Sequence, residues 1–395
     1  MRIDRIEAKA IPDTRGRATV ETTLFAGPFS ALASVPSGKS TGAHEAHELR
    51  DADGGVSQAA ENVTGEIANA LAAQDFVSAD ELDAFLVELD GTNDKSRLGA
   101  NALLSVSIAA TRLFAQEESV PLWKAIATRA GTAPSAPRLY VNVMNGGVHA
   151  DFKLPFQEYI LVVEGNTSAA LPIAREAFAK LGEWLGNVPM GDEGGYAPTF
   201  DTLEQPFELL AELVKEFPST SIAIDAAASE LFHDGHYELL GKSYSAEELT
   251  TIYDSVAEKY PLHSIEDPFD EESANDFTRL TATLGEKILI VGDDLTVTNP
   301  ARINDAIVRK EINAVLIKPN QIGTVREAIA AVQATYGAGW KAVASHRSGE
   351  TDDTFIADFA YGVGAHGIKA GGLGQKERLE KYERLLAIEQ ESKSR

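Results

Sequence analysis

The stretch Asn313-Ala-Val-Leu-Ile-Lys318 places four apolar residues in front of a single lysine. Pro319, Asn320 and Gly323, which are turn formers, follow it. A short apolar run bounded by turn residues is typical of a buried strand, whose last residue then lies at the carboxyl end. The stretch therefore predicts a core strand that ends on an ionisable side chain.

The same arrangement recurs in the second half of the chain. Each recurrence is a short apolar run that ends on an acid, a histidine or a lysine, and these runs are Ser221–Asp225, His263–Glu266, Ile288–Asp293, Lys341–His346 and His366–Lys369. Helical segments with recognisable starts lie between them, as at Ser245–Glu248. Strands that alternate with helices predict parallel strands joined by crossover helices.

Two earlier apolar runs, Tyr140–Asn145 and Gln157–Val163, flank the turn-rich stretch Gly146–Lys153 and bring the expected strands to eight. Helices are expected at Thr167–Asn187 and Leu203–Phe217. Eight strands in ~250 residues favour a closed barrel of the (β/α) type over an open sheet. Chemistry in such barrels takes place at the carboxyl ends of the strands, where the ionisable residues fall.

The first part of the chain has a different organisation. Strands are expected at Ile3–Ala10, Ala18–Phe25 and Phe29–Val35, and helices at Ser57–Ala73, Ala79–Leu89 and Leu98–Glu117. This mixture predicts an α+β domain. The uncharged, proline-containing segment Gly131–Pro137 is typical of a linker. The expected domains are therefore residues 1–130, a linker at 131–137 and a barrel at 138–395.

Composition narrows the classes of function. The chain has 395 residues, a formal net charge of −25 and no cysteine. The acidic charge argues against binding to nucleic acid or to an anionic membrane. The lack of cysteine excludes disulfides, zinc–thiolate sites and thiol nucleophiles. The charged start Met1–Glu7 and the lack of a membrane-length apolar run predict a cytoplasmic protein.

Three carboxylates end successive expected strands: Asp225, Glu266 and Asp293. One such acid alone would more often cap a helix or lie at the surface. Three that converge in a barrel repel one another, so they require a cation. Oxygen ligands without cysteine or histidine favour Mg²⁺ over Zn²⁺. The neighbouring acids Asp267 and Asp294 are better candidates for capping.

Two lysines, Lys318 and Lys369, end later strands of the same expected barrel. A lysine taken alone is most often a surface residue. Buried beside another cation, however, a lysine has a lowered pKa and becomes usable as a base.

Three loops add further candidates. His346-Arg-Ser-Gly-Glu350 suits an anionic group such as phosphate, and Gly191-Asp-Glu-Gly-Gly195 would hold an acid close to a substrate. Either could equally be an ordinary loop. Ser37-Gly-Lys-Ser-Thr41 lacks the first glycine of a nucleotide-binding loop, since residue 33 is alanine. A mobile lid with a hydroxyl ligand is the better interpretation.

At these residues the chain resembles the enolase family, the phosphopyruvate hydratases. The resemblance covers nearly the whole chain and is carried by Asp13–Gly16, Ser37–Gly42, Asn145–His149, Gly191–Gly195, Ser264–Phe269, Asp293–Pro300 and Ser345–Glu350. It implies an N-terminal α+β domain followed by an enolase-type (β/α)8 barrel. It also implies the glycolytic, Mg²⁺-dependent dehydration of 2-phosphoglycerate to phosphoenolpyruvate by a homodimer or a higher homo-oligomer.

The resemblance also implies roles for individual residues. A first Mg²⁺ would be held by Asp225, Glu266 and Asp293, and a second, recruited with the substrate, by Ser40. Lys318 would remove the proton alpha to the substrate carboxylate, while Glu193, supported by Glu158, would assist the departure of hydroxide. The substrate, a small phosphorylated carboxylic acid, would be surrounded by His149, Gln157, Lys369, His346, Arg347 and Ser348.

The chain departs from the family pattern at several positions. Lys39 replaces a small residue beside Ser40, the rim Ala370–Lys376 differs, and Ala387 replaces an arginine that pairs across the family dimer with the residue matching Glu21. Two alternatives to this function stay open, and the departures fit the first of them. One is an enolase-like enzyme of phosphonate or phosphinate biosynthesis that forms a carboxyphosphonoenolpyruvate-type product. The other is a non-catalytic enolase-like binding protein.

Overall fold

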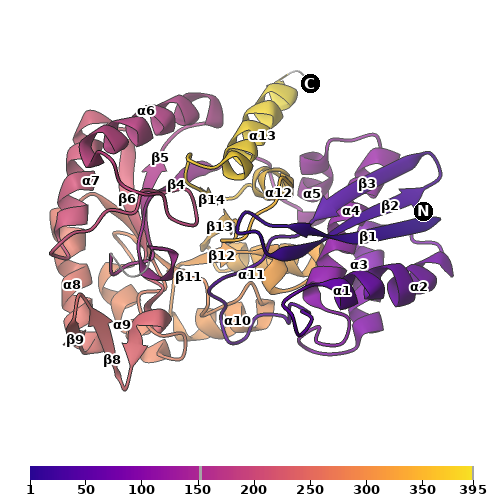
Figure 1. The fold of residues 1–395 in the computed structure, drawn as a ribbon, viewed down its shortest axis with the longest axis horizontal. Helices are drawn as coiled ribbons and strands as arrows, with labels where there is room; N and C mark the ends of the chain where they lie inside the picture. The colour runs from indigo at the N-terminus through magenta and orange to yellow at the C-terminus, as the bar shows by residue number, and fades with distance from the viewer. Residues whose placement is uncertain (151–153, 394–395) are drawn as a thin grey trace.

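The computed structural model describes residues 1–150 and 154–393, so residues 151–153 of the expected turn-rich stretch lie outside the described part. An N-terminal α+β part and a larger barrel lie side by side, at the right and left of Figure 1. Among the described residues, no helix has the length and apolar character needed to cross a membrane.

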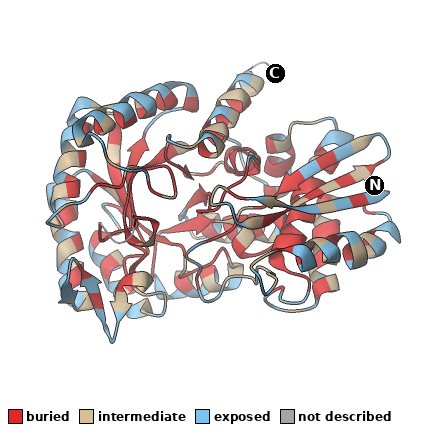
Figure 2. Cartoon of the chain, viewed as in Figure 1, coloured by how far each residue is buried: buried red, intermediate tan, exposed pale blue. Residues whose placement is uncertain are grey.

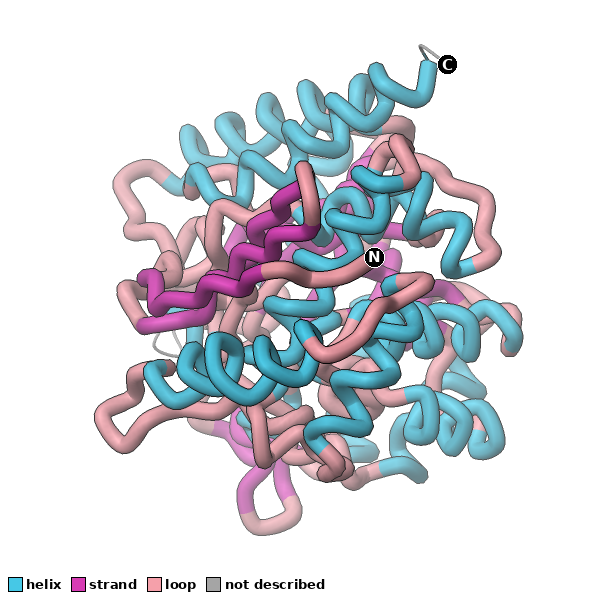
Figure 3. The backbone as a smooth tube through the Cα atoms, turned by 90° about the vertical axis from the view of Figure 1, so that its right-hand side faces the viewer, coloured by secondary structure: helices cyan, strands magenta, loops and turns pink. Residues whose placement is uncertain are grey.

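The N-terminal sheet is an antiparallel meander of β1 (Arg5–Pro12), β2 (Ala18–Ala26) and β3 (Phe29–Ser34). Alternate residues of β2 are buried, and this face packs on α4 (Ala100–Glu117), which is buried along nearly its whole length. Figure 3 views the molecule from the side on which this sheet lies. The remaining helices are α1 (Ser57–Asn62), the π-helical turn η1 (Val63–Ile67), α2 (Ala68–Ala72), α3 (Ala79–Asp90) and α5 (Leu122–Ala130).

Eight strands close into a barrel in the order β10-β11-β12-β13-β14-β4-β5-β6, which confirms the fold class. Their bounds are β4 (Arg138–Asn145), β5 (Glu158–Val163), β6 (Thr220–Asp225), β10 (Leu262–Glu266), β11 (Leu289–Gly292), β12 (Ala314–Ile317), β13 (Lys341–Ser345) and β14 (Gly367–Gly371). The first stretch analysed, Asn313–Lys318, is thus a central barrel strand followed by its lysine.

The six strands that alternate with helices are parallel, as predicted. β5, for which the sequence predicted no direction, runs antiparallel to both β4 and β6. The other neighbouring pairs in the barrel are parallel. β4 and β5 follow one another without an intervening crossover helix, and an antiparallel pair needs no crossover. The reversed strand therefore begins at the end of the barrel where its neighbours finish.

Helices cover the outside of the barrel (Figure 1), and they are α6 (Thr167–Leu185), α7 (Gln205–Glu216), α8 (Ala246–Lys259), α9 (Ala274–Leu284), α10 (Pro300–Arg309), α11 (Val325–Gly337), α12 (Phe355–Gly362) and α13 (Lys376–Lys393). The predicted capping box at Ser245 is present. A small sheet, β7 (Phe232–His233), β8 (His236–Leu239) and β9 (Lys242–Tyr244), was not predicted.

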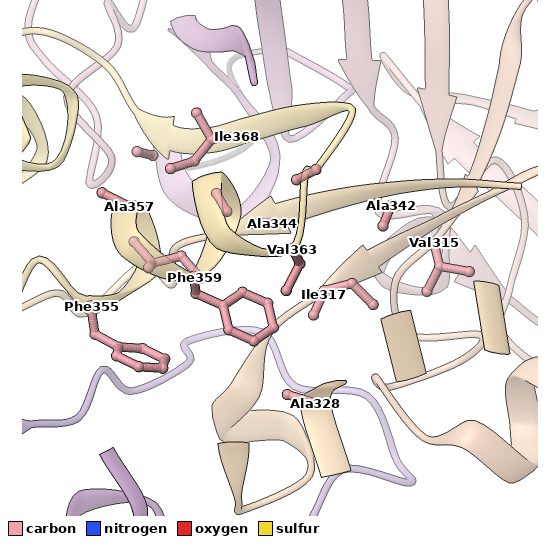
Figure 4. Packing of buried hydrophobic residues seen from close by; sticks show 14 of the residues in the cluster. Val315, Ile317, Ala328, Ala342, Ala344, Phe355, Ala357, Phe359, Val363 and Ile368 are labelled. Atoms are coloured by element: carbon pink, nitrogen blue, oxygen red, sulfur yellow. The ribbon is translucent and has the colours of Figure 1, made fainter. Parts of the chain in front are cut away.

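Buried residues concentrate on the barrel strands and on the helix faces turned toward them (Figure 2). Val315 and Ile317 of β12 point outward and pack in one cluster with Phe359 of α12 (Figure 4). Ala314 and Leu316 belong to a second cluster, formed inside the barrel. Successive strand residues point to opposite faces, so this alternation fixes which strand-end side chains turn into the barrel.

The two parts of the chain meet through buried polar contacts. Arg112 of α4 donates to both carboxylate oxygens of Asp353, at 2.7 Å each. The backbone N–H of Ser34 donates to the same carboxylate at 3.0 Å. Residues 131–137 connect α5 to β4, and the division of the chain at 130 and 138 stays a prediction.

Candidate active site

Strand register turns the key side chains toward the inside of the barrel. Leu316 lies in the interior cluster, so Lys318, two residues on, continues the same face. Ala223 and Val291 of the interior cluster stand in the same relation to Asp225 and Asp293. The apolar alternation that builds the core thus also brings these strand ends together.

The reversed strand β5 supplies its residues from the opposite terminus. Glu158 is its first residue and lies opposite both Asn145, at the end of β4, and Asp225, at the end of β6. Because β5 is antiparallel, its start lies level with the carboxyl ends of the other strands. Gln157, which precedes it, donates to Asp225 at 3.4 Å.

Acids and lysines interlock in the floor of the site. The Lys369 Nζ lies 2.8 Å from both oxygens of Glu266, 3.1 Å from Asp225 and 3.4 Å from Glu158. Lys318 Nζ donates to the carboxylate of Asp293. All six side chains are largely buried, so this is a dense cluster of opposite charges with little solvent to screen it.

The charges shift one another's pKa. Burial, followed by the charge of Asp225, raises the pKa of Glu266 well above its usual value. Burial disfavours the charged form of Lys318, whereas the negative charges of Asp293 and Glu266 favour it, and the net effect is a raised pKa of Lys318. The lowered lysine pKa that the sequence favoured is therefore not found while Asp293 is its partner.

The acidic cluster has the chemistry of a site for a hard cation. Asp225, Glu266 and Asp293 provide only oxygen donors, and ammonium groups now supply the positive charge that they need. Among the described residues, two groups bring their ligand atoms within 4.8 Å of one another, and these are Glu158, Glu193 and His346, and Asp267, Asp293 and Asp294. Asp225 and Glu266 belong to neither group. The oxygen donors of Asp225, Glu266 and Asp293 are of the kind that fits Mg²⁺.

Asp267 has the capping role that the sequence favoured. Its carboxylate accepts the backbone N–H of Asp293 at 2.9 Å and that of Asp294 at 2.7 Å. Both of its oxygens thus hold the turn that carries Asp293, which leaves Asp293 itself as the better ligand.

Glu193 and Glu158 form a buried carboxyl pair beside this cluster. Burial and then the charge of Glu193 raise the pKa of Glu158 well above its usual value. Burial acts to raise the pKa of Glu193 as well. The charge of His149 and the hydrogen bond from Glu158 act in the opposite direction, and the net effect is a pKa of Glu193 well below its usual value. One proton shared by two carboxyl groups is the state that these shifts favour.

The loop after β13 contributes His346, Arg347 and Ser348. Arg347 is almost fully buried and donates to both oxygens of Glu45, at 2.8 and 2.9 Å. Burial and then the Arg378 charge hold the pKa of His346 well below its usual value, so this imidazole is neutral.

The loop Ser37–Gly42 lies across the site. The Ser40 hydroxyl donates to Glu230 at 2.6 Å, and the Ser40 carbonyl accepts from Arg347 at 3.2 Å. Lys39 Nζ donates to the Val148 carbonyl at 2.8 Å and to Asp192 at 2.6 Å. The loop is therefore tied to four other segments of the chain, those of Val148, Asp192, Glu230 and Arg347.

These residues enclose a polar cavity with a space of about 420 Å³ including its open mouth. Of the predicted site residues, all but Glu266 line this cavity, and these are Ser40, His149, Gln157, Glu158, Glu193, Asp225, Asp293, Lys318, His346, Arg347, Ser348 and Lys369. Glu266 does not line the cavity itself but accepts a hydrogen bond from the cavity-lining Lys369. The buried Oε1 of Gln157 has no hydrogen-bond partner within the described part of the chain. A polar atom left unpaired at such a place suits a ligand.

Three supporting residues were not predicted: Glu45, Gln375 and Arg378. Arg378 is fully buried on the face of α13 that also carries Tyr382 and Leu385. A charged residue at a core-facing position of an amphipathic helix was the available signal, since such a residue needs buried partners. Glu45 and Gln375 lie outside any periodic pattern.

The departing rim Ala370–Lys376 packs on the loop that carries Glu193. The backbone N–H of Gly372 donates to the Glu193 carbonyl at 2.8 Å. A Cβ at Gly372 would lie 2.1 Å from the Gly194 carbonyl, so glycine allows the two loops to touch. The rim therefore supports the position of Glu193.

Comparison with protein families gives two matches. The model for "Enolase, N-terminal domain" matches residues 3–126. The model for "Enolase, C-terminal TIM barrel domain" matches residues 135–395. Together they account for nearly the whole chain.

Proposed function

Because this chain belongs to the enolase family, we propose that it is a Mg²⁺-dependent lyase that removes water from 2-phosphoglycerate to form phosphoenolpyruvate. One observation carries the proposal. A buried lysine, Lys318, and the buried carboxyl pair Glu158 and Glu193 line one cavity, which the acids Asp225 and Asp293 and the residues His346–Ser348 also line.

Lys318 is the proposed base. The proton alpha to a carboxylate is very weakly acidic, and its removal places a second negative charge on the substrate. Lys318 lies at the end of β12 with its ammonium group among the acids, so it can take up a proton once its own is released. Lys369, buried beside Asp225 and Glu266, contributes a fixed positive charge near the developing anion.

Asp225, Glu266 and Asp293 would hold the first Mg²⁺, and Ser40 would help hold a second that arrives with the substrate. Bound Mg²⁺ would neutralise the charge that builds up on the substrate carboxylate. The carboxylates of this chain would then exchange ammonium partners for metal, which frees Lys318 from Asp293.

The carboxyl pair is the proposed acid. Glu193 shares a proton with Glu158 and lies 3.5 Å from the Nε2 of His149. Such a pair can protonate a departing hydroxyl group while the charge that remains stays spread over two residues. Arg347, with a pKa raised by Glu45 against the effect of burial, stays charged and suits the phosphoryl group.

The direct test follows phosphoenolpyruvate absorbance after 2-phosphoglycerate is added to the purified protein. We expect turnover with Mg²⁺, its loss with EDTA and its return when Mg²⁺ is restored in excess. A folded protein that binds Mg²⁺ and leaves 2-phosphoglycerate unchanged would contradict the proposal.

Lys39 favours a second candidate, the enolase-like enzyme that acts on a phosphonate. Its ammonium group lies 2.6 Å from Asp192, the residue that precedes the cavity-lining Glu193. A substrate with an additional anionic group could take the place of Asp192 as its partner. Phosphorus NMR of mixtures with 2-phosphoglycerate and with a phosphonate analogue separates the two, because the candidate substrate alone should be converted.

A homodimer in the cytoplasm is also part of the proposal. Glu21, the residue that pairs across the dimer in the resembling family, is bound here by Lys9 of the same chain at 2.8 Å. With Ala387 in place of the partner arginine, a dimer would need other contacts. Sedimentation analysis decides the state, and a clean monomer would contradict this part.

A further inference from the structure

Arg378 is a fully buried arginine whose hydrogens are all used. Its Nη1 donates to the Nδ1 of His346 and to the Arg347 carbonyl at 3.2 Å. Its Nη2 donates to the carbonyls of Ser348, at 2.9 Å, and Asp192, at 3.2 Å. Its Nε donates to Gln375 at 2.7 Å. An arginine has five N–H donors, and five acceptors surround this one.

The donor count determines the state of His346. A guanidinium has no acceptor, so the Nδ1 that faces Arg378 must present its lone pair. A neutral imidazole carries its one hydrogen on the other nitrogen, here Nε2. The pKa of His346 lies well below its usual value because of burial and the charge of Arg378, which agrees with a neutral ring.

Gln375 holds the arginine in turn. Its Oε1 accepts from the Nε of Arg378, and its Nε2 donates to the Asp192 carbonyl at 3.1 Å. That carbonyl also accepts from Arg378. The amide therefore fixes the plane of the guanidinium against the loop Gly191–Gly195.

We propose that Arg378, held by Gln375, is a positioning residue that fixes His346 with its hydrogen on Nε2, so that His346 can only donate to a ligand in the cavity. The ligand atom that it meets must be an acceptor, such as a phosphoryl or hydroxyl oxygen. The kinetic consequences rest on the proposed function, whereas the tautomer is a property of the protein alone.

Removal of Arg378 would allow His346 to carry its hydrogen on Nδ1 instead of Nε2. The Arg347 carbonyl and the Nδ1 of His346 now share the same nitrogen of Arg378. In Arg378→Met that carbonyl loses its donor, and a hydrogen on Nδ1 can replace it. The Nε2 would then face the cavity as an acceptor, the wrong polarity for an anion.

Nitrogen NMR of histidine-labelled protein tests the tautomer directly. The chain has eight histidines, and His346→Gln identifies the signal of His346. We expect a neutral ring with its hydrogen on Nε2 in the wild-type protein from pH 5 to 8. A hydrogen on Nδ1, or a charged ring at pH 7, would overturn the proposal.

The variants test the cause. Arg378→Met should shift His346 toward the Nδ1–H tautomer and lower kcat/KM by about 10- to 100-fold, the range usual for residues that orient a functional side chain. The loss of kcat/KM in Arg378→Met should deepen as the pH rises through about 6.5. Without its arginine partner, His346 gives up a proton in this range, and its Nε2 then no longer has to be a donor. Arg378→Lys, which keeps a charged donor, should recover the tautomer and most of the activity.

Gln375→Met keeps the arginine and provides the milder variant if Arg378→Met does not fold. We expect a mixture of tautomers and a smaller loss of kcat/KM, which should deepen with rising pH in the same way. Arg384→Met is the matched control, because Arg384 lies on the same helix but binds Asp358 and Glu391. It should alter neither the tautomer nor the pH profile.

Two outcomes separate this proposal from the proposed function. Wild-type protein with the Nε2–H tautomer but without turnover of 2-phosphoglycerate would reject the function and leave the positioning role standing. An active enzyme whose His346 tautomer is the same in wild type, Arg378→Met and Gln375→Met would reject the positioning role alone.

Discussion

At the scale of single residues, the site joins a lysine base and a carboxyl pair that perform different steps. Lys318 and Glu193 both line the cavity, but they contact different partners, Asp293 and Asn142 respectively. Each side chain can therefore be removed without taking away the partner of the other. Substitutions at the two positions should separate proton removal from the loss of hydroxide.

Lys318→Ala should lower kcat by about 10²- to 10⁴-fold, the usual contribution of a general base. It should also abolish exchange of the substrate alpha proton with deuterium from D₂O, followed by proton NMR. Glu193→Gln should retain the exchange but lose the elimination of water. Lys310→Ala, which changes a lysine at the end of α10, is the control. Exchange that persists in Lys318→Ala would remove the base assignment.

Lys39→Ala tests the tie between the loop Ser37–Gly42 and Asp192. The pair is partly exposed, at 40% and 36%, so it contributes about 0.2–1 kcal/mol. The KM for 2-phosphoglycerate should rise about two- to fivefold, with kcat nearly unchanged, and Lys39→Arg should restore it. A KM that falls in Lys39→Ala would mean that the lysine disfavours this substrate, which supports the phosphonate candidate.

At the scale of secondary structure elements, most of the site could be predicted because most barrel strands carry two sequence signals, an apolar run and an ionisable residue at its end. The run Ala314–Ile317 marks its strand by hydrophobicity, and the ionisable residue after it marks the catalytic end. Glu158 could be recognised only by resemblance, because it begins its strand. Its strand is reversed, and the apolar residues of β5 give no sign of direction.

Supporting residues were harder to predict because their partners lie far away in sequence. Arg378 meets His346 across two elements, and Glu45 meets Arg347 from the other part of the chain. No local spacing encodes such contacts. The same holds for Asp353, whose partner Arg112 lies on a helix that reads as uniformly apolar.

The histidine pair at the other end of the barrel should make stability depend on pH. His366 of the β13–β14 connection lies 3.4 Å from His263 of β10, and burial, Arg138 and His263 lower its pKa to about 3. Unfolded His366 takes up a proton near pH 6.5 and the folded form does not. Stability from this group is therefore complete above about pH 6.5 and is lost progressively as the pH falls toward 3.

Urea unfolding of His366→Gln measures this effect. Between pH 7 and 5 the variant should lose less free energy of unfolding than the wild type. The difference should be below about 1.4 kcal/mol per pH unit, since solvent screens a partly exposed group. His233→Gln, at an exposed histidine of β7, should leave the slope unchanged. Equal slopes for His366→Gln and wild type would contradict the assigned pKa.

At the scale of the whole molecule, the ion pair between Arg112 and Asp353 joins the N-terminal part to the barrel. Burial opposes the charge of Asp353, but Arg112 outweighs it and lowers the pKa of that carboxyl. Asp353→Ala should cost roughly 2–4 kcal/mol, because it leaves a buried guanidinium without its partner. The measurement is the free energy of unfolding in urea.

The double variant Arg112→Met with Asp353→Leu should cost less than Asp353→Ala, since neither charge then stays buried and unpaired. Glu212→Ala, which breaks the exposed pair with Lys215, is the control and should change stability by less than about 0.5 kcal/mol. A loss in Asp353→Ala no larger than in this control would mean that the contact does not hold the two parts together.

The reversed strand also has a consequence for the order of assembly. β4, β5 and β6 pair through neighbouring stretches of chain, whereas closure of the barrel joins β4 to β14, near the other terminus. Contacts that are local in sequence form before distant ones. A chain emerging from the ribosome would therefore build the strands of Glu158 and Asp225 early and receive Lys369 with its last strand. Glu158, Asp225 and Glu266 contact Lys369 in the folded protein, and they would lack its ammonium group until synthesis is nearly complete. A truncated chain should therefore expose unpaired carboxylates and be readily degraded.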